Sequence, residues 1–291
     1  MASQLSRHSG FLVATAATTL LIAVPAIRTA ILERKLARRI TYHHTLLGDA
    51  ARELLLRTSE SEDDDAGGKQ ATRAAAAVPA PYPTPLSTLP QTLITSSQAH
   101  NIFYDISLLP IPTSTLPPLL TTYLQHNMQL FSRSPQGWIL WATQRDGKAR
   151  RSFEREWIES LGFEVGELVN GLYTVVERGT LVGGEGEEGE GGAKVVFGMS
   201  RGKVEGRLVI SIRIADGEMV EALIKAGDGR HGRESTQEKG VMVFCTETWM
   251  WVRKDARETM PMEMAVPRFM HRVLSWRLLV SGTEHLQGLA R

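Results

Sequence analysis

The chain has 291 residues, with 33 Lys and Arg against 32 Asp and Glu, and its formal net charge is +1. This balance gives no bulk attraction to a phosphate backbone, so we expect no nucleic-acid partner. The single cysteine, Cys245, excludes an intramolecular disulfide framework, and the sequence has no Asn-x-Ser/Thr glycosylation site. Both features argue against an extracellular protein.

The N-terminal segment contains an uncharged, mostly apolar run from Gly10 to Ile27. A helix of this length rises about 27 Å, just enough to cross a hydrocarbon core of roughly 30 Å. The positive-inside rule then predicts that residues 1–40 form a single-pass membrane anchor and basic flank, with the C-terminal body in the cytosol. The basic residues that follow the apolar run are Arg28, Arg34, Lys35, Arg38 and Arg39.

Two alternatives for this segment stay open. Arg7 and the small-residue sequence Val24-Pro25-Ala26 also fit a cleaved secretory signal peptide. The lack of an acidic residue before Glu33 also fits a mitochondrial presequence. The bilayer is the partner that the first interpretation requires.

Residues 41–57 are expected to form a short amphipathic helix, because Leu46, Leu47, Leu54 and Leu55 recur at helical spacing. Residues 58–92 are acidic and then Pro-rich, which predicts a disordered linker. The acidic run lacks the glycine and the terminal glutamate of a calcium loop, so we expect a solvated charge run there.

Residues 93–288 are predicted to form a single α+β domain, with flexible inserts at 182–193 and 215–240. Strands that follow one another without helices favour an antiparallel sheet with its helices on one face, closed by a long C-terminal helix. The predicted helices are Leu116–Phe131, Ala149–Leu161 and Pro267–Val280, and the predicted strands are Glu167–Glu177, Lys194–Met199, Arg207–Ile214 and Val241–Val252.

Two glycine-rich segments match a cofactor-binding or a catalytic sequence motif, but neither has the structural context that the motif requires. Gly184–Gly189 satisfies the dinucleotide pattern, but its glutamates would repel a pyrophosphate and no helix follows. Gly198–Gly202 satisfies the nucleophile-elbow pattern, but a second strand follows where the elbow needs a helix. We therefore interpret Gly198–Gly202 as a hairpin turn.

The histidines are scattered, and no His-Glu-x-x-His or Cys-x-x-Cys pattern occurs. His271 points away from the apolar stripe of the closing helix and is set aside as a site residue. We expect no metal and no cofactor.

Glu247 is the one candidate catalytic residue. Period-2 alternation places it on the same side of its strand as Cys245, Trp249 and Trp251, inside an apolar and aromatic face. Burial would raise its pKa and make it a candidate acid, base or ligand contact. The alternative is an ion pair with Arg213 or Arg207 on a neighbouring strand.

The aromatic residues extend this hypothesis. The candidate ligand-binding set is Glu247, Trp249, Trp251 and Trp276. The alternative interpretation places five tryptophans in the core: Trp138, Trp141, Trp249, Trp251 and Trp276.

Three segments resemble uncharacterised proteins of filamentous fungi: Arg151–Arg155 with the strand Glu167–Glu177, the strand segment Glu247–Trp251, and the closing helix. The order of strands closed by a C-terminal helix is also similar to helix-grip (START-like) domains. That resemblance implies a sheet wrapped around the helix with an apolar pocket between them.

Three functions follow as hypotheses. The first is a non-enzymatic, membrane-anchored domain that binds a lipid or another apolar small molecule. The second is a hot-dog-type enzyme acting on acyl thioesters, with Glu247 as its carboxylate and the helix Ala149–Leu161 wrapped by the sheet. The third is a structural adaptor. We favour the first over an enzyme.

Overall fold

The computed structural model describes two units of the chain, Met1–Arg39 and Ile40–Arg291. In the first unit, residues 31–36 are helical. No helix within the described ranges is both long and apolar enough to span a bilayer. The predicted anchor Gly10–Ile27 and the linker 58–92 lie outside these ranges. The residues described are 29, 31–47, 100–112, 120–182, 190–215, 241–256 and 258–290.

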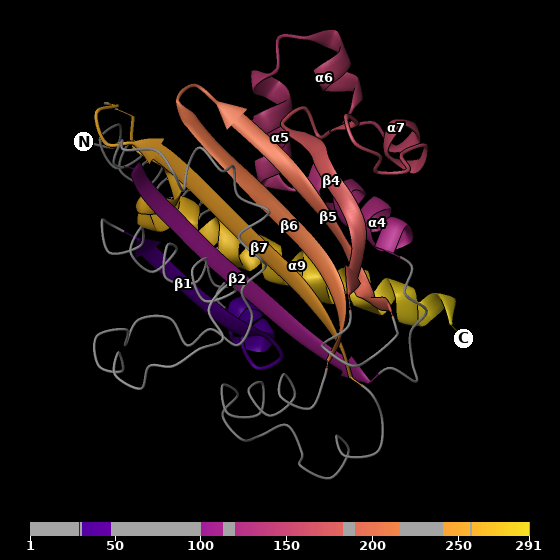
Figure 1. The fold of residues 1–291 in the computed structure, drawn as a ribbon. Coiled ribbons are helices and arrows are strands. Elements are labelled where there is room, and N and C mark those ends of the chain that lie inside the picture. Colours follow the sequence, from indigo (N-terminus) through magenta and orange to yellow (C-terminus); the bar gives the residue numbers. More distant parts are fainter. Residues whose placement is uncertain are drawn as a thin grey trace, which may run out of the picture. The chain divides into compact units, whose positions relative to one another are not determined.

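The second unit is built on one sheet of seven antiparallel strands, in the order β1-β2-β7-β6-β5-β4-β3 (Figure 1). Strands β3 to β7 form a meander in chain order, and the early strand β2 pairs with the last strand, β7. The strands are β1 (Thr41–Leu47), β2 (His100–Pro112), β3 (Leu168–Val169), β4 (Tyr173–Val182), β5 (Glu190–Arg201), β6 (Val204–Ala215) and β7 (Val241–Arg253).

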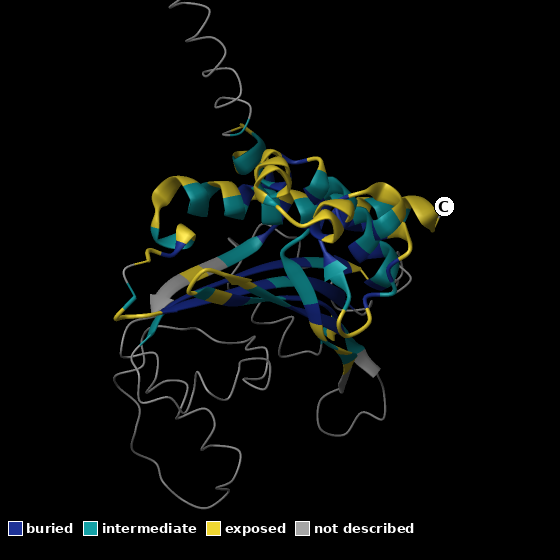
Figure 2. Ribbon diagram, turned by 90° about the horizontal axis from the view of Figure 1, so that it is seen from above, coloured by how far each residue is buried: buried dark blue, intermediate teal, exposed yellow. Residues whose placement is uncertain are grey.

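The α-helices of this unit lie on one side of the sheet (Figure 2). The longest, α9, contacts β2 and β7 and packs against α4. The antiparallel α+β fold and its long C-terminal helix are therefore as predicted. The helices are α4 (Leu120–Ser132), α5 (Pro135–Thr143), α6 (Gly147–Arg151), α7 (Arg155–Glu159), the 3-10 helix η3 (Pro261–Glu263) and α9 (Ala265–Leu289).

Aromatic side chains fill the space between the sheet and its helices. The ring centroids of Tyr123 on α4 and Phe244 on β7 are 5.1 Å apart, and both side chains are buried. Gly282 brings α9 against α4 so closely that a Cβ there would lie 2.4 Å from the ring of Tyr123. This part of the interface is packed as a solid core.

The prediction of a helix over 41–57 is wrong for its first part, because Thr41–Leu47 forms β1 and pairs with β2. The segment begins Thr-Tyr-His-His-Thr, and β-branched and aromatic residues favour strands. Residues 48–57 lie outside the described ranges. The compact unit thus begins at Ile40, well before the predicted boundary at residue 93.

The predicted helix Ala149–Leu161 is in fact two short helices, α6 and α7, which Ser152 separates. Its hydroxyl donates to the carbonyl of Ala149 at 2.7 Å and accepts from the backbone N–H of Gly171 at 2.7 Å. The contact with Gly171, in the loop before β4, holds Ser152 at the end of α6, so the helix does not continue. Of the predicted flexible inserts, 190–193 and 215 belong to strands β5 and β6, while 183–189 and 216–240 lie outside the described ranges.

Candidate functional site

Glu247 lies in the middle of β7, and its side chain has no exposed surface. Its Oε1 accepts a hydrogen bond of 3.1 Å from Nη2 of Arg213, which lies on the neighbouring strand β6. The ion pair named as the alternative for Glu247 is therefore present. The other candidate partner, Arg207, places its guanidinium carbon 5.8 Å from the ring centroid of Trp251.

Two neutral donors share this buried environment. The thiol of Cys245 lies 3.6 Å from Oε1 of Glu247. Burial, together with the nearby Glu247 carboxylate, raises the pKa of the Cys245 thiol and that of the Tyr104 hydroxyl. Because the thiolate is the reactive form, Cys245 is a poor nucleophile at neutral pH.

Trp249 and Trp251 lie on the same face as Glu247 and are buried. The ring centroid of Trp249 lies 4.2 Å from that of Tyr104 on β2. Its indole Nε1 has no hydrogen-bond partner among the residues that the structure describes. An acceptor on a ligand could satisfy this donor, and ligand binding at this face stays a prediction.

Trp276 lies on the other side of the sheet. Its indole Nε1 donates to the hydroxyl of Ser107 at 3.2 Å, on the face that α9 covers. Its ring meets Tyr42 edge to face, with centroids 5.4 Å apart. The sheet separates Trp276 from Glu247, Trp249 and Trp251, so the four predicted residues do not form one site.

The helix-covered face holds a polar cluster that sequence reasoning missed. Nε2 of His271 on α9 lies 3.2 Å from Oδ2 of Asp105 on β2. The same nitrogen lies 3.2 Å from Oγ1 of Thr248, which pairs with Asp105 across the two strands. Desolvation opposes protonation of His271, but the charge of Asp105 and its hydrogen bond outweigh it and raise the pKa of His271.

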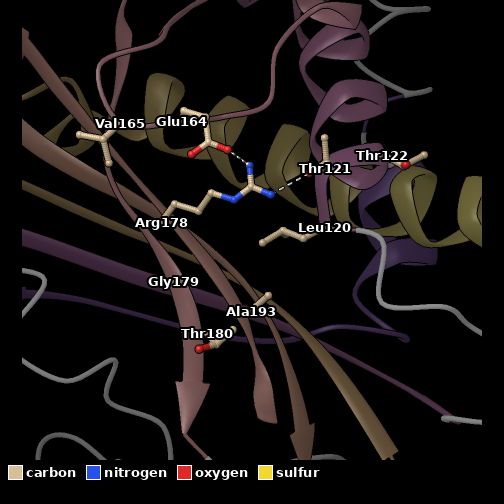
Figure 3. A pocket seen from close by; sticks show the side chains of 9 residues that line it. All are labelled: Leu120, Thr121, Thr122, Glu164, Val165, Arg178, Gly179, Thr180 and Ala193. Carbon is tan, nitrogen blue, oxygen red and sulfur yellow. Dashed lines mark hydrogen bonds and ion pairs between the residues drawn. The ribbon is translucent and has the colours of Figure 1, made fainter.

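An open groove of about 500 Å³ lies where the first turn of α4 faces strands β4 and β5 (Figure 3). Arg178 of β4 reaches into it. Nη2 of Arg178 donates to Oγ1 of Thr121 at 3.1 Å, and Nη1 contacts the carboxylate of Glu164 at 3.2 Å and the carbonyl of Gly162. The groove is lined by Leu120, Thr121, Thr122, Glu164, Val165, Arg178, Gly179, Thr180 and Ala193.

The groove combines an apolar wall with one cation, Arg178, and one carboxylate, Glu164, which pairs with it at 3.2 Å and which an anionic ligand would have to displace. Its volume falls within the range of about 300–1,000 Å³ that is common for ligand sites. An arginine guanidinium is suited to a carboxylate or a phosphate, because it offers several donors in one plane. The arrangement can accept a ligand that has an apolar part and an anionic head.

The described residues offer little for metal or serine chemistry. No group of three or more His, Cys, Asp and Glu side chains among them is placed to hold a metal ion. Gly198–Gly202 forms the end of β5 and the turn into β6, with Gly202 at φ +63°. The hairpin interpretation is confirmed, because a strand and not a helix follows.

No protein-family model, curated protein or solved structure matches the chain. The function is therefore argued from the residues and their geometry.

Proposed function

We propose that residues 40–291 form a helix-grip-type binding domain that holds an amphipathic small molecule, such as a fatty acid or another lipid, in the groove around Arg178. The apolar segment Gly10–Ile27 would tether this domain to a membrane. The observation that carries the proposal is the guanidinium of Arg178 inside a groove partly lined by Leu120, Val165 and Ala193.

The chain order supports the helix-grip assignment. After strand β1 the chain forms strand β2, then the helices α4 to α7, then the meander β3 to β7, and α9 closes it against β2 and β7. The strand-rich middle closed by a C-terminal helix is the outline of such domains, whereas the helices α4 to α7 before the meander do not match it closely. Strand β1, at the edge beside β2, is an addition to that outline.

The groove opens on the helix-covered side of the sheet, between α4 and strands β4 and β5, and not between the sheet and α9. Arg178 pairs with Val195 across β4 and β5, and Thr180 pairs with Ala193, so these positions share a face. An alkyl chain along Leu120 and Ala193 would leave the head of the ligand beside Arg178. The tether would hold the domain where such molecules partition.

The two alternative functions find less support. A hot-dog enzyme needs an early helix wrapped by the sheet, whereas residues 149–161 form the short helices α6 and α7. Its proposed carboxylate, Glu247, is already bonded to Arg213. A structural adaptor would need the contacts of Arg178 to Thr121 and Glu164 but not the open groove around them, so the groove favours a binding domain.

Native mass spectrometry of the full chain, released from detergent micelles, tests the proposal with dodecanoic acid as the probe. We expect a one-to-one adduct, and we expect Arg178→Gln to weaken it by about 10-fold to 100-fold, because a charge-assisted hydrogen bond contributes about 1.5–3 kcal/mol. 1-Dodecanol, which lacks the carboxylate, should bind to the wild type more weakly than dodecanoic acid does. Its affinity should change little in Arg178→Gln.

Two further variants locate the adduct. Ala193→Leu narrows the groove and should also reduce the adduct, whereas Ser200→Leu makes the same kind of addition at an exposed position of the same strand and should not. An adduct that all three variants retain equally would place the ligand elsewhere and refute this site.

A further inference from the structure

The helix α5 exposes a broad apolar face. Trp138 is 64% exposed, Ile139 60% and Trp141 47%. At about 100° per residue, these three side chains and the neighbouring Ala142 cover roughly 160° of the helix. The expectation that Trp138 and Trp141 lie in the core is therefore wrong. A helix of this kind on a surface marks a contact with something outside the domain.

The surface of α5 is rigidly presented. The hydroxyl of Ser134 caps the helix by accepting from the N–H of Gly137 at 3.0 Å, and Pro135 occupies the first turn. Gly137 packs against the end of α4, where a Cβ would lie 2.2 Å from the carbonyl oxygen of Phe131. The angle between α4 and α5 is thus fixed by close contact.

The segment that follows α5 is basic, and one of its cations lies against the apolar surface. The guanidinium carbon of Arg150 lies 5.3 Å from the ring centroid of Trp141, and its Nε donates to the carbonyl of Gln144 at 2.9 Å. The one acidic residue in the segment, Asp146, caps α6 through the N–H of Ala149. The exposed cations of the segment are Arg145, Lys148, Arg150 and Arg151. In Figure 1, α5 and α6 stand together at the upper edge of the view.

We propose that α5 and α6 form a docking surface for an anionic lipid bilayer, with Trp138, Ile139 and Trp141 entering the headgroup region and Lys148 and Arg151 contacting lipid phosphates or carboxylates. Tryptophan is enriched at the membrane–water interface, and each nearby Lys or Arg adds attraction to an anionic leaflet. The inference is independent of the groove around Arg178 and of the segment Gly10–Ile27.

Charge decides between a bilayer and a second copy of the chain. A symmetric dimer through α5 would bring two copies of the basic segment together, and their repulsion would oppose the apolar contact. Against an anionic lipid surface, the same cations make binding more favourable. The single apolar helix beside four cations and one carboxylate therefore fits a bilayer better than a copy of itself.

The test is a local probe on the full chain. Cys245 is buried and its thiol pKa is raised, so a cysteine introduced by Ile139→Cys is the reactive thiol and accepts a nitrobenzoxadiazole fluorophore. The labelled chain is mixed with phosphatidylcholine vesicles and with vesicles of a roughly 7:3 mixture of phosphatidylcholine and phosphatidylserine. We expect a blue shift and stronger emission only with phosphatidylserine, and weakening by added salt.

Matched variants identify the cause. Lys148→Gln with Arg151→Gln should lower the docked-to-undocked ratio about 30-fold, from about 1 kcal/mol per cation. Arg201→Gln with Lys203→Gln removes two exposed cations at the β5–β6 turn and should change nothing. The same fluorophore at Ser200→Cys should not respond to either vesicle. All these positions are exposed, so the variants should fold, which thermal unfolding checks.

Three outcomes would overturn the proposal. One is an equal response at positions 139 and 200, which would report general association through another part of the chain. Another is a response at position 139 that Lys148→Gln with Arg151→Gln leaves intact. The third is a concentration-dependent blue shift without lipid, which would mean that a second copy covers α5. Retention of dodecanoic acid should be unchanged in these variants, so a failure here would be distinct from a failure of the groove.

Discussion

His271 and Asp105 join the C-terminal helix to strand β2 through a contact of 3.2 Å between Nε2 and Oδ2. Asp105 is 3% exposed, so this ion pair stands in a largely dry environment. Because the protonated imidazole is the form that Asp105 stabilises, the stability of the α9–sheet interface should depend on pH.

The sign of that dependence follows from the raised pKa of His271. Its contribution is fully present below the ordinary value of 6.5 and is lost as the pH rises through the higher folded-state value. His126 acts in the opposite direction, because burial and the nearby His285 lower its pKa. Urea unfolding of the wild type and of His271→Gln, measured at pH values below and above 6.5, separates the contributions of His271 and His126. Only the wild type should lose stability as the pH rises above 6.5. Parallel pH profiles would contradict the prediction.

The ion pair between Glu247 and Arg213 should couple strongly. Removing one partner of a buried pair leaves the other charge without compensation and costs about 3–5 kcal/mol. We expect Glu247→Leu and Arg213→Met each to reduce the free energy of unfolding by about that amount, and the double variant to recover much of it. Additive losses in a double-mutant cycle would show that the two side chains act separately. The control is Arg207→Met. Arg207 lies on the same strand as Arg213, but it contacts the ring of Trp251 and not Glu247.

Two glycines on α9 should respond oppositely to the same change. A Cβ at Gly282 would lie 2.4 Å from Tyr123 and 2.7 Å from Oδ1 of Asn127, so Gly282→Ala should destabilise the domain by about 1–3 kcal/mol. A Cβ at Gly288 meets nothing within 4 Å, so Gly288→Ala should be neutral or gain up to about 1 kcal/mol. Thermal unfolding measures both. Equal effects would mean that α4 and α9 do not pack as described.

Cys245 should resist alkylation in the folded protein. Its side chain is buried and its thiol pKa is raised, so the thiolate is scarce and inaccessible. Iodoacetamide at pH about 8 should label it only in urea. Rapid labelling without urea would mean that the face around Glu247 opens to solvent, which would revive a catalytic role for this face.

The sequence predicts the strands that alternate or carry a long apolar run. Arg207–Ile214 and Val241–Val252 correspond closely to β6 and β7, because their patterns resemble no helix. Strand β2 was not predicted. It is buried on both faces, so it lacks alternation, and Pro110 and Pro112 near its end argue against a strand. Helix α9 was predicted but is longer than the stripe that indicated it.

The candidate site was less predictable, because it depends on which residues meet across the sheet. Period-2 alternation places Glu247, Trp249 and Trp251 on one face, yet nothing in it indicates that Trp276 lies on the other. His271 was set aside since it lies off the apolar stripe, whereas a polar residue off that stripe can still reach a buried carboxylate. The sequence does hold one sign of this cluster, because the acidic residue Asp105 stands inside an apolar run. Trp138 and Trp141 have an apolar composition that fits a core and a membrane surface equally.

The pairing of β2 with β7 also bears on how the chain folds. Asp105 lies opposite Thr248, so the β2–β7 ladder joins segments that the ribosome makes at widely separated times. The meander from β3 to β6 can form from local hairpins. Strand β2, however, must wait with both of its apolar faces uncovered until β7 has emerged. Pairing between segments far apart in the sequence slows folding and leaves an intermediate that is prone to aggregate. We therefore expect the nascent chain to depend on chaperones until β7 and α9 enclose β2.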